Sequence, residues 1–302
     1  MMNGYLQLFF NVILLLFWAR LWTPRSGAFY FNPFLARATL LTDRVYTFFA
    51  PALRLSEPAM TLLILLVVWA FKALMVGRLG GEWQVLVGSA FIFSAPVIAE
   101  AWWPHFLFSG LHFFLFIVRL WAVYYVVMLI TPVFRSSRAL EVFAFLARPF
   151  SGLPRWLQPV VLVLAHFVIV SLIARAGELK TLSILSLEIQ EIAVGKSPFL
   201  VGTEWSQAWH LVALAVLSVL DGLSFLTSSL VFVIVCQLVS AILGLNVLAL
   251  ICQETCDILL GRFSKGKRLV TGVLDFTPLI FFFVVQFIYG NLSQIVYKLI
   301  MR

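Results

Sequence analysis

Six long apolar runs, separated by short polar or basic stretches, constrain this chain more than any other feature. They cover about residues 4–22, 58–76, 107–130, 159–173, 225–245 and 278–292. A helix of about 20 residues, rising 1.5 Å per residue, crosses the roughly 30 Å hydrocarbon core of a bilayer. Hydrophobic residues make up 63% of the sequence and charged residues only 11%. The sequence therefore predicts an all-α polytopic membrane protein.

The basic residues give a formal net charge of +8, yet they stand at the ends of the apolar runs and form no dense block. This placement is typical of topology signals and of contacts with lipid headgroups. We therefore expect anionic headgroups as binding partners and no nucleic acid.

An amphipathic segment lies between the first two runs. Asn32 is a good helix N-cap and Pro33 a good first helical residue. Apolar side chains then recur at spacings of four and three, at Phe34, Ala38, Leu41, Val45 and Phe48. Because Arg37 and Arg44 fall on another face, the pattern predicts a helix that lies in the membrane surface and ends at Pro51.

Two further apolar pieces are shorter than a span. Residues 82–100 are interrupted by Pro96, which indicates a re-entrant or interfacial helix, and residues 204–222 begin with the same Glu-Trp pair. Whether these pieces cross the membrane is left open, so we expect about six transmembrane helices, with eight as the upper number. Residues 175–202 are more polar and predict an amphipathic helix outside the bilayer.

The order of span, basic amphipathic segment and proline-opened span occurs three times, with the prolines at Pro58, Pro159 and Pro278. A period of roughly 100 residues is longer than that of solenoid repeats. We therefore predict a triplicated unit. Residues 1–100 form the first unit with its short re-entrant piece, residues 101–203 a degenerate second unit with its extramembrane connector, and residues 204–302 the third unit.

The charge distribution predicts the orientation. Each of the three loops inside a unit carries four basic residues, whereas the connectors between units carry more acidic residues. By the positive-inside rule the loops inside the units face the cytoplasm and the N-terminus lies outside.

Short motifs carry a family resemblance. The stretch Phe29-Tyr30-Phe31-Asn32-Pro33-Phe34, followed by Leu41-Thr42-Asp43, resembles the YggT family of integral membrane proteins, also called YlmG-like. Asp275-Phe276-Thr277-Pro278 looks like the motif that opens the next span in that family. The motif positions are Asn32, Pro33, Asp43, Pro58, Asp257, Asp275 and Pro278.

The chain also departs from the family pattern. The arginine pair of the family is missing from the first unit, and the second unit has Arg148-Pro149 where an Asp-Pro step is expected. The resemblance implies a plasma-membrane or plastid-membrane protein without known catalysis. It links bacterial members to osmotic or potassium stress and cell division, and plastid members to nucleoid distribution and cytochrome-complex maturation. We favour a bacterial inner (plasma) membrane over a plastid membrane.

Three sets of side chains are candidates for function. The lipid-binding or partner-binding set is Arg37, Arg44, Arg262, Lys265, Lys267 and Arg268. The intramembrane polar set is Arg119, His112 and His166. Lys72 also falls within a run, where it can snorkel to the interface. A charge inside the membrane is costly, so Arg119 is either paired with another repeat unit or part of a substrate or ion path.

The remaining chemistry has simpler interpretations. Cys252 and Cys256 stand four apart on one helical face, but a structural zinc site needs four ligands. His112 and His166 could hold a haem, although intramembrane hydrogen bonding is the more common role of such histidines. We find no hydrolase elbow, phosphate loop or paired-carboxylate pattern, and predict a non-enzymatic protein with no cofactor or metal.

These features predict a scaffold or assembly factor in envelope, osmotic-stress or division-related processes. Its partners would be anionic lipids and membrane or cytoplasmic proteins. The alternative is a channel or secondary transporter for a small ion or solute, and a haem-binding redox subunit ranks third.

Overall fold

The computed structural model describes residues 2–23, 32–80, 83–87, 91–95, 102–130, 138–176, 178–185, 188–193, 205–242, 244, 252–257, 260, 270–271, 274–275 and 277–300. Nearly all of the apolar runs fall within these ranges.

Helices dominate the described residues. They are α1 (Met2–Leu21), α2 (Pro33–Leu53), α3 (Glu57–Gly80), α4 (Trp102–Ile130), α5 (Arg138–Leu146), η2 (Phe150–Gly152), α6 (Gln158–Ala176), α7 (Trp205–Ile242) and α9 (Thr277–Ile300). Five of them contain stretches long and apolar enough to cross a bilayer: Glu57–Arg78, Trp103–Leu129, Gln158–Ala176, Trp209–Cys236 and Thr277–Val296. α1 adds the shorter apolar stretch Leu6–Leu21. The predicted helical, polytopic membrane architecture is confirmed.

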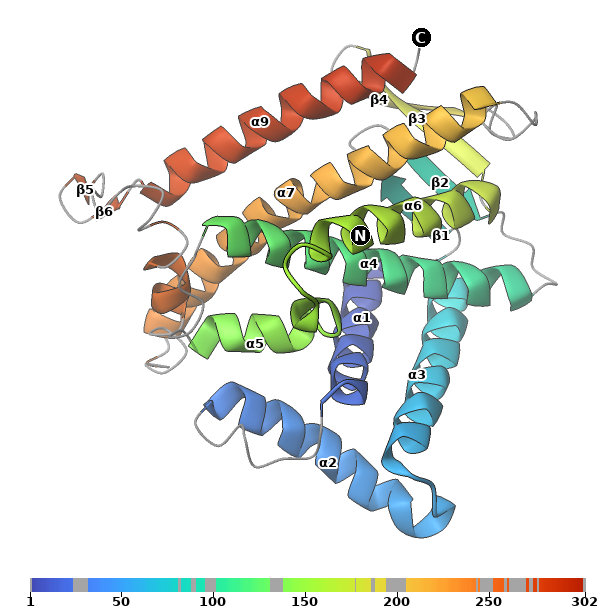
Figure 1. Ribbon diagram of the computed structural model, residues 1–302, viewed down its shortest axis with the longest axis vertical. Coiled ribbons are helices and arrows are strands. Elements are labelled where there is room, and N and C mark those ends of the chain that lie inside the picture. The colour runs from blue at the N-terminus through green and yellow to red at the C-terminus, as the bar shows by residue number, and fades with distance from the viewer. Residues whose placement is uncertain are drawn as a thin grey trace.

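The helices form one bundle, in which α1 and α3 lie side by side (Figure 1). α2 lies across one end of this pair and α4 across the other (Figure 1). α4 also packs against α6 and α7, and α7 contacts both α6 and α9. α2 therefore joins the ends of α1 and α3 that are remote from α4.

A four-stranded antiparallel sheet replaces two of the predicted helices. Its strands are β1 (Trp83–Val87), β2 (Phe91–Ala95), β3 (Glu178–Leu185) and β4 (Glu188–Ala193), in the order β1-β2-β3-β4. The helix predictions for residues 82–100 and 175–202 are thus wrong. In β1 the side chains of Val85 and Val87 are buried and that of Leu86 is exposed, and this period of two suits a strand and not a helix.

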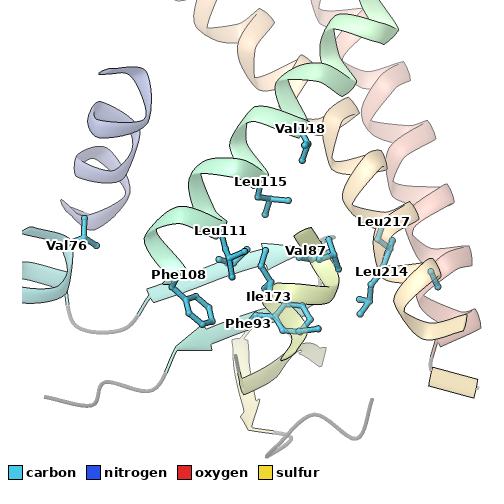
Figure 2. Close-up of a cluster of buried hydrophobic side chains, with 14 residues drawn as sticks. Val76, Val87, Phe93, Phe108, Leu111, Leu115, Val118, Ile173, Leu214 and Leu217 are labelled. Carbon is cyan, nitrogen blue, oxygen red and sulfur yellow. The ribbon is translucent and has the colours of Figure 1, made fainter. Parts of the chain in front are cut away.

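The sheet links the first two predicted units, because β2 pairs with β3 and Phe93 lies opposite Leu179. Its inner face joins the largest buried cluster. Val87 and Phe93 pack there against α4, α6 and α7 through residues such as Leu115 and Ile173 (Figure 2).

The second of the two short apolar pieces does not form a separate helix. Residues 205–222 belong to α7, which continues without a break to Ile242 and contains a single candidate span. Asp221 and Gly222 do not interrupt the helix, since Asp221 has an ionic partner and Gly222 packs closely on α4. Within the described residues, the two short apolar pieces therefore add no separate transmembrane helix, and the predicted maximum of eight is not reached.

Helix α2 begins as expected and ends slightly later. The Leu35 amide donates to Asn32 Oδ1 at 3.4 Å, and Pro33 is the first helical residue, which confirms the predicted N-cap. The helix continues through Pro51 to Leu53, where Arg54 takes a positive φ of 48°. A left-handed residue is a common way for a helix to stop.

Helices α4 and α7 approach closely at Gly222, where an added Cβ would lie 2.7 Å from the Ala122 Cβ. Alanine cannot rotate out of the way, so Gly222→Ala must push the helices apart. We expect this variant to lose about 1–3 kcal/mol of stability. Thermal unfolding in detergent, followed by tryptophan fluorescence, measures the change.

Gly290→Ala is the matched control, because an added Cβ at Gly290 in α9 would meet nothing within 4 Å. Its melting temperature should stay the same or rise slightly, since alanine favours a helix over glycine. Equal melting temperatures for the two variants would contradict the close contact between α4 and α7.

Candidate functional site

An ion pair joins three spans at the centre of the bundle. Arg119 of α4 donates from Nη2 to Asp221 Oδ2 of α7 at 2.6 Å. The Tyr289 hydroxyl of α9 donates to the other carboxylate oxygen at 3.0 Å. The Asp221 carboxylate therefore receives a guanidinium and a phenol from two different helices.

Arg119 also ties the sheet to the bundle, because its Nη2 donates to the Leu86 carbonyl oxygen. Leu86 belongs to β1, which is an edge strand of the four-stranded sheet. An edge strand leaves backbone carbonyl groups without a strand partner, and the guanidinium supplies a donor to this one. One guanidinium thus bonds to a carboxylate in α7 and to a strand edge.

A second polar cluster lies between α1, α3 and α4. The Lys72 side chain is fully buried, at 0% exposure. Its Nζ donates to Asn11 Oδ1 at 2.7 Å and to the Ser109 carbonyl oxygen at 3.2 Å. The expectation that Lys72 snorkels to the interface is therefore wrong. Internal acceptors hold the amine inside the bundle.

The two predicted intramembrane histidines have different surroundings. His112 Nδ1 lies 3.4 Å from Asn11 Nδ2, so it adjoins the Lys72 cluster. His166 is fully buried, and its Nδ1 lies 2.9 Å from the Leu162 carbonyl oxygen of its own helix. Within the described residues, His166 Nε2 has no hydrogen-bond partner. Each histidine therefore has its own protein contact on Nδ1.

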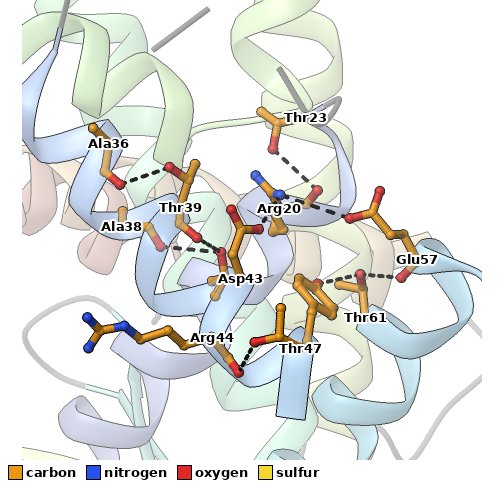
Figure 3. Close-up of polar contacts among 12 residues, drawn as sticks. Arg20, Thr23, Ala36, Ala38, Thr39, Asp43, Arg44, Thr47, Glu57 and Thr61 are labelled. Atoms are coloured by element: carbon orange, nitrogen blue, oxygen red, sulfur yellow. Dashed lines mark hydrogen bonds and ion pairs between the residues drawn. The ribbon is translucent and has the colours of Figure 1, made fainter. Parts of the chain in front are cut away.

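A third cluster lies where α1 ends, α2 crosses and α3 begins (Figure 3). Arg20 Nη2 donates to Asp43 Oδ1 at 2.7 Å and lies 4.0 Å from Glu57 Oε1. Asp43 was predicted as a motif residue, and this contact fixes α2 to the first span.

Two more contacts hold α2 in place. The Tyr46 hydroxyl lies 2.6 Å from Thr61 Oγ1, and Thr61 donates to the Glu57 carbonyl oxygen. Burial raises the pKa of the Tyr46 phenol, which keeps the group protonated as a donor. Asn32 Nδ2 donates to Glu141 of α5 at 3.0 Å. Side chains from the start and the middle of α2 thus bind neighbouring helices.

These contacts divide α2 into three faces. Leu35, Thr42 and Tyr46 are buried against the bundle. Two residues of the predicted apolar stripe are exposed, Leu41 at 56% and Phe48 at 78%, whereas Ala38 is partly buried and Val45 packs against the core. Arg37 and Arg44 are exposed on the edge next to this stripe. A helix with an exposed apolar stripe beside basic residues is suited to the membrane interface.

Several predicted residues lie apart from these clusters. Pro58 and Pro278 fall in the first turns of α3 and α9, and Asp275 lies in β6 (Leu274–Asp275), which pairs with β5 (Val270–Thr271). Asp257 is exposed at the end of the helical stretch 252–257. The basic residues Arg262, Lys265, Lys267 and Arg268 lie outside the described residues.

Cys252 and Cys256 are both buried. Burial raises the pKa of the Cys252 thiol, which disfavours the thiolate that a metal would bind. Among the described residues no group of three or more His, Cys, Asp and Glu side chains could hold a metal ion.

Sequence reasoning singled out Arg119 but gave it no partner, and it did not connect Asn11 with Lys72. The available signal was the equal offset of Asn11 and Arg119 from the prolines that follow their spans, Pro24 and Pro132. In the structure each of these two residues is central to a polar cluster. The partners could not be read from spacing, because they lie 61 and 102 residues away.

Comparison of the chain with known protein families, curated proteins and solved structures finds no match. The resemblance to the YggT family therefore stays a prediction.

The pair between Arg119 and Asp221 can be tested with a double-mutant cycle. Asp221→Asn should lower stability by about 3 kcal/mol, because it leaves a buried guanidinium without its counter-charge. Arg119→Gln combined with Asp221→Asn should recover at least half of that loss, since no unpaired charge remains. Thermal unfolding of the purified Asp221→Asn, Arg119→Gln and double variants completes the cycle. Additive losses in the double variant would show that the two side chains act independently.

The Lys72 cluster predicts an asymmetry between its two members. Asn11→Leu removes the 2.7 Å acceptor of a buried amine and should cost about 2–3 kcal/mol. Lys72→Met keeps a similar volume without the amine and should cost less. Comparing the two melting temperatures measures the difference, and a larger loss for Lys72→Met would contradict the prediction.

Proposed function

We propose that this chain is a non-enzymatic integral membrane scaffold or assembly factor of the YggT type, located in a bacterial inner membrane. Helix α2 supports this proposal more than any other feature. It lies across the ends of two helices and exposes the apolar side chains of Leu41 and Phe48 beside a basic edge.

The apolar stripe gives α2 a reason to enter the bilayer surface. Leu41 and Phe48 are among its most exposed side chains, and their burial in lipid is favourable by roughly 25 cal/mol for each Å² removed from water. Arg37 and Arg44 then lie at headgroup level, where each basic residue contributes about 1 kcal/mol of attraction to an anionic surface.

The way in which α2 is fixed supports the scaffold role. The ion pair of Arg20 with Asp43 and the hydrogen bond of Tyr46 with Thr61 attach the middle of the helix to α1 and α3. The basic edge is consequently displayed in a fixed position relative to the spans. A rigid display suits the recruitment of lipids or partner proteins. In this proposal α2 faces the cytoplasm and the N-terminus lies outside.

The alternative function is a channel or secondary transporter. Its supporting observation is the set of charged side chains within the bundle, namely Lys72, Arg119 and Asp221. We rank it second because these groups contact one another or neighbouring amides and carbonyls, which is how structural charges in membrane proteins are satisfied. Ion or solute flux in proteoliposomes that is lost with Arg119→Leu would reverse the ranking.

The scaffold proposal predicts the effect of neutralising the basic edge. The double variant Arg37→Gln and Arg44→Gln should weaken the attraction to anionic lipid by about 2 kcal/mol, or roughly 30-fold. Purification from native membranes, with mass-spectrometric quantification of bound anionic lipids and of co-purifying proteins, measures the loss.

Arg175→Gln is the matched control, because Arg175 is an exposed arginine in the last turn of α6 and lies outside α2. It should leave the recovery of lipids and proteins unchanged. If the α2 variant and the control retain the same lipids and proteins as the native chain, α2 does not perform the proposed role.

A further inference from the structure

Helix α9 lies at the edge of the bundle and packs mainly against α7 (Figure 1). Its candidate span, Thr277–Val296, is the least buried of the five, with only 11% buried inside the chain. Most of this span therefore faces away from the rest of the protein, towards lipid or towards another membrane helix.

Two amides lie on this outer face of α9. Asn291 and Gln294 are both exposed, and both belong to the candidate span. Asn291 precedes the end of the span at Val296 by five residues, which places it about 7 Å inside at 1.5 Å per residue. Lipid tails offer an amide no hydrogen bond. A lipid-facing position therefore does not explain these two residues.

Contacts within the chain leave hydrogen-bonding capacity on both amides. Asn291 Nδ2 donates to the Phe287 carbonyl oxygen of its own helix at 2.7 Å, and its Oδ1 has no partner among the described residues. The Gln294 side chain makes no hydrogen bond within the described ranges. Gln286, by contrast, donates to Thr227 Oγ1 of α7 at 2.6 Å. The amide that faces α7 is thus paired, whereas the outer amides can bond to another molecule.

The positions around the amides suit contact with a second helix. Ile280, Phe283, Phe287, Gly290 and Gln294 recur at spacings of three and four, the pattern of a parallel two-helix seam. Phe283 is 61% and Phe287 is 73% exposed. An added Cβ at Gly290 would meet nothing within 4 Å, so packing inside the chain does not require glycine there. Small and polar residues together are typical of associating membrane helices.

The chemistry of this seam selects a second copy of the chain as the partner. No charged residue occurs between Ile280 and Gln294. An amide is both a donor and an acceptor, so it can pair with the same amide of another copy. Two copies in one membrane have the same orientation, and a two-fold axis along the membrane normal then brings equal residues together at equal depth. A helix of unrelated sequence has no such match.

We propose that α9 forms a symmetric dimer interface with a second copy of this chain. Gln294 pairs with the Gln294 of the other copy, and Asn291 lies beside this pair. Phe283 and Phe287 pack along the seam, and Gly290 allows the two helices to approach closely. The interface is separate from the basic edge of α2 and does not depend on the scaffold role.

Energy transfer between donor-labelled and acceptor-labelled copies of the full-length protein in proteoliposomes tests the dimer. The transfer should rise with the protein-to-lipid ratio and saturate as a two-body equilibrium does. It should also exceed the transfer that random encounters in the bilayer produce. Transfer at the level of random encounters would overturn the proposal, since α9 would then be covered by lipid or by a different protein.

Variants of α9 locate the contact. Asn291→Leu combined with Gln294→Leu should weaken association about tenfold, because the hydrogen bonds between the two copies are lost. Gly290→Ile should also weaken it, because the larger side chain holds the helices apart while its Cβ has open space in its own copy. Since all three positions lie on the outer side of α9, we expect both variants to fold.

Ser228→Leu is the matched control. Ser228 is an exposed polar residue in the α7 span and, like Asn291, it bonds to a carbonyl one turn earlier in its own helix, donating to the Ser224 carbonyl oxygen at 3.0 Å. This variant should leave the energy transfer unchanged. Native transfer in both α9 variants, or an equal loss in the control, would overturn the proposal.

Discussion

An ionic group inside a bilayer must find its partner within the protein, and this bundle is arranged around the pair that meets that condition. Arg119 reaches Asp221, Tyr289 reaches the same carboxylate, and the strand edge at Leu86 uses the same guanidinium. Three spans and the sheet therefore depend on one cluster. Gly222 stands next to Asp221, and its lack of a side chain allows α7 to approach α4 there.

Charged side chains also pair within the protein where α1 ends and α3 begins, but a charge costs less free energy at this position. Arg20, Asp43 and Glu57 lie where spans end, so their charges are close to headgroups and water. The contacts there fix one face of α2, which directs its apolar stripe and its basic edge outward. They also leave a polar cavity beside Arg20. The proposed basic display surface therefore originates in the way a single helix is attached.

Local sequence signals predicted much of this arrangement. The spans, the start of α2 at Asn32 and Pro33, and the membrane class all follow from short-range properties. The sheet was missed because residues 82–100 were judged by hydropathy and by Pro96. The alternation of buried Val85 and Val87 with exposed Leu86 is not visible in a run of apolar residues. The continuity of α7 was missed because Asp221 and Gly222 have poor helix propensity.

The sequence by itself determined which segments are apolar enough to enter a membrane, how they are separated and where α2 begins, because hydropathy and capping act over a few neighbouring residues. Tertiary structure alone decided which side of α2 is buried, how the strands from two predicted units pair, and which group each buried charge contacts. Asn11 with Lys72 and Arg119 with Asp221 meet across helices. Such pairings depend on helix rotation and packing, which spacing along one helix does not specify.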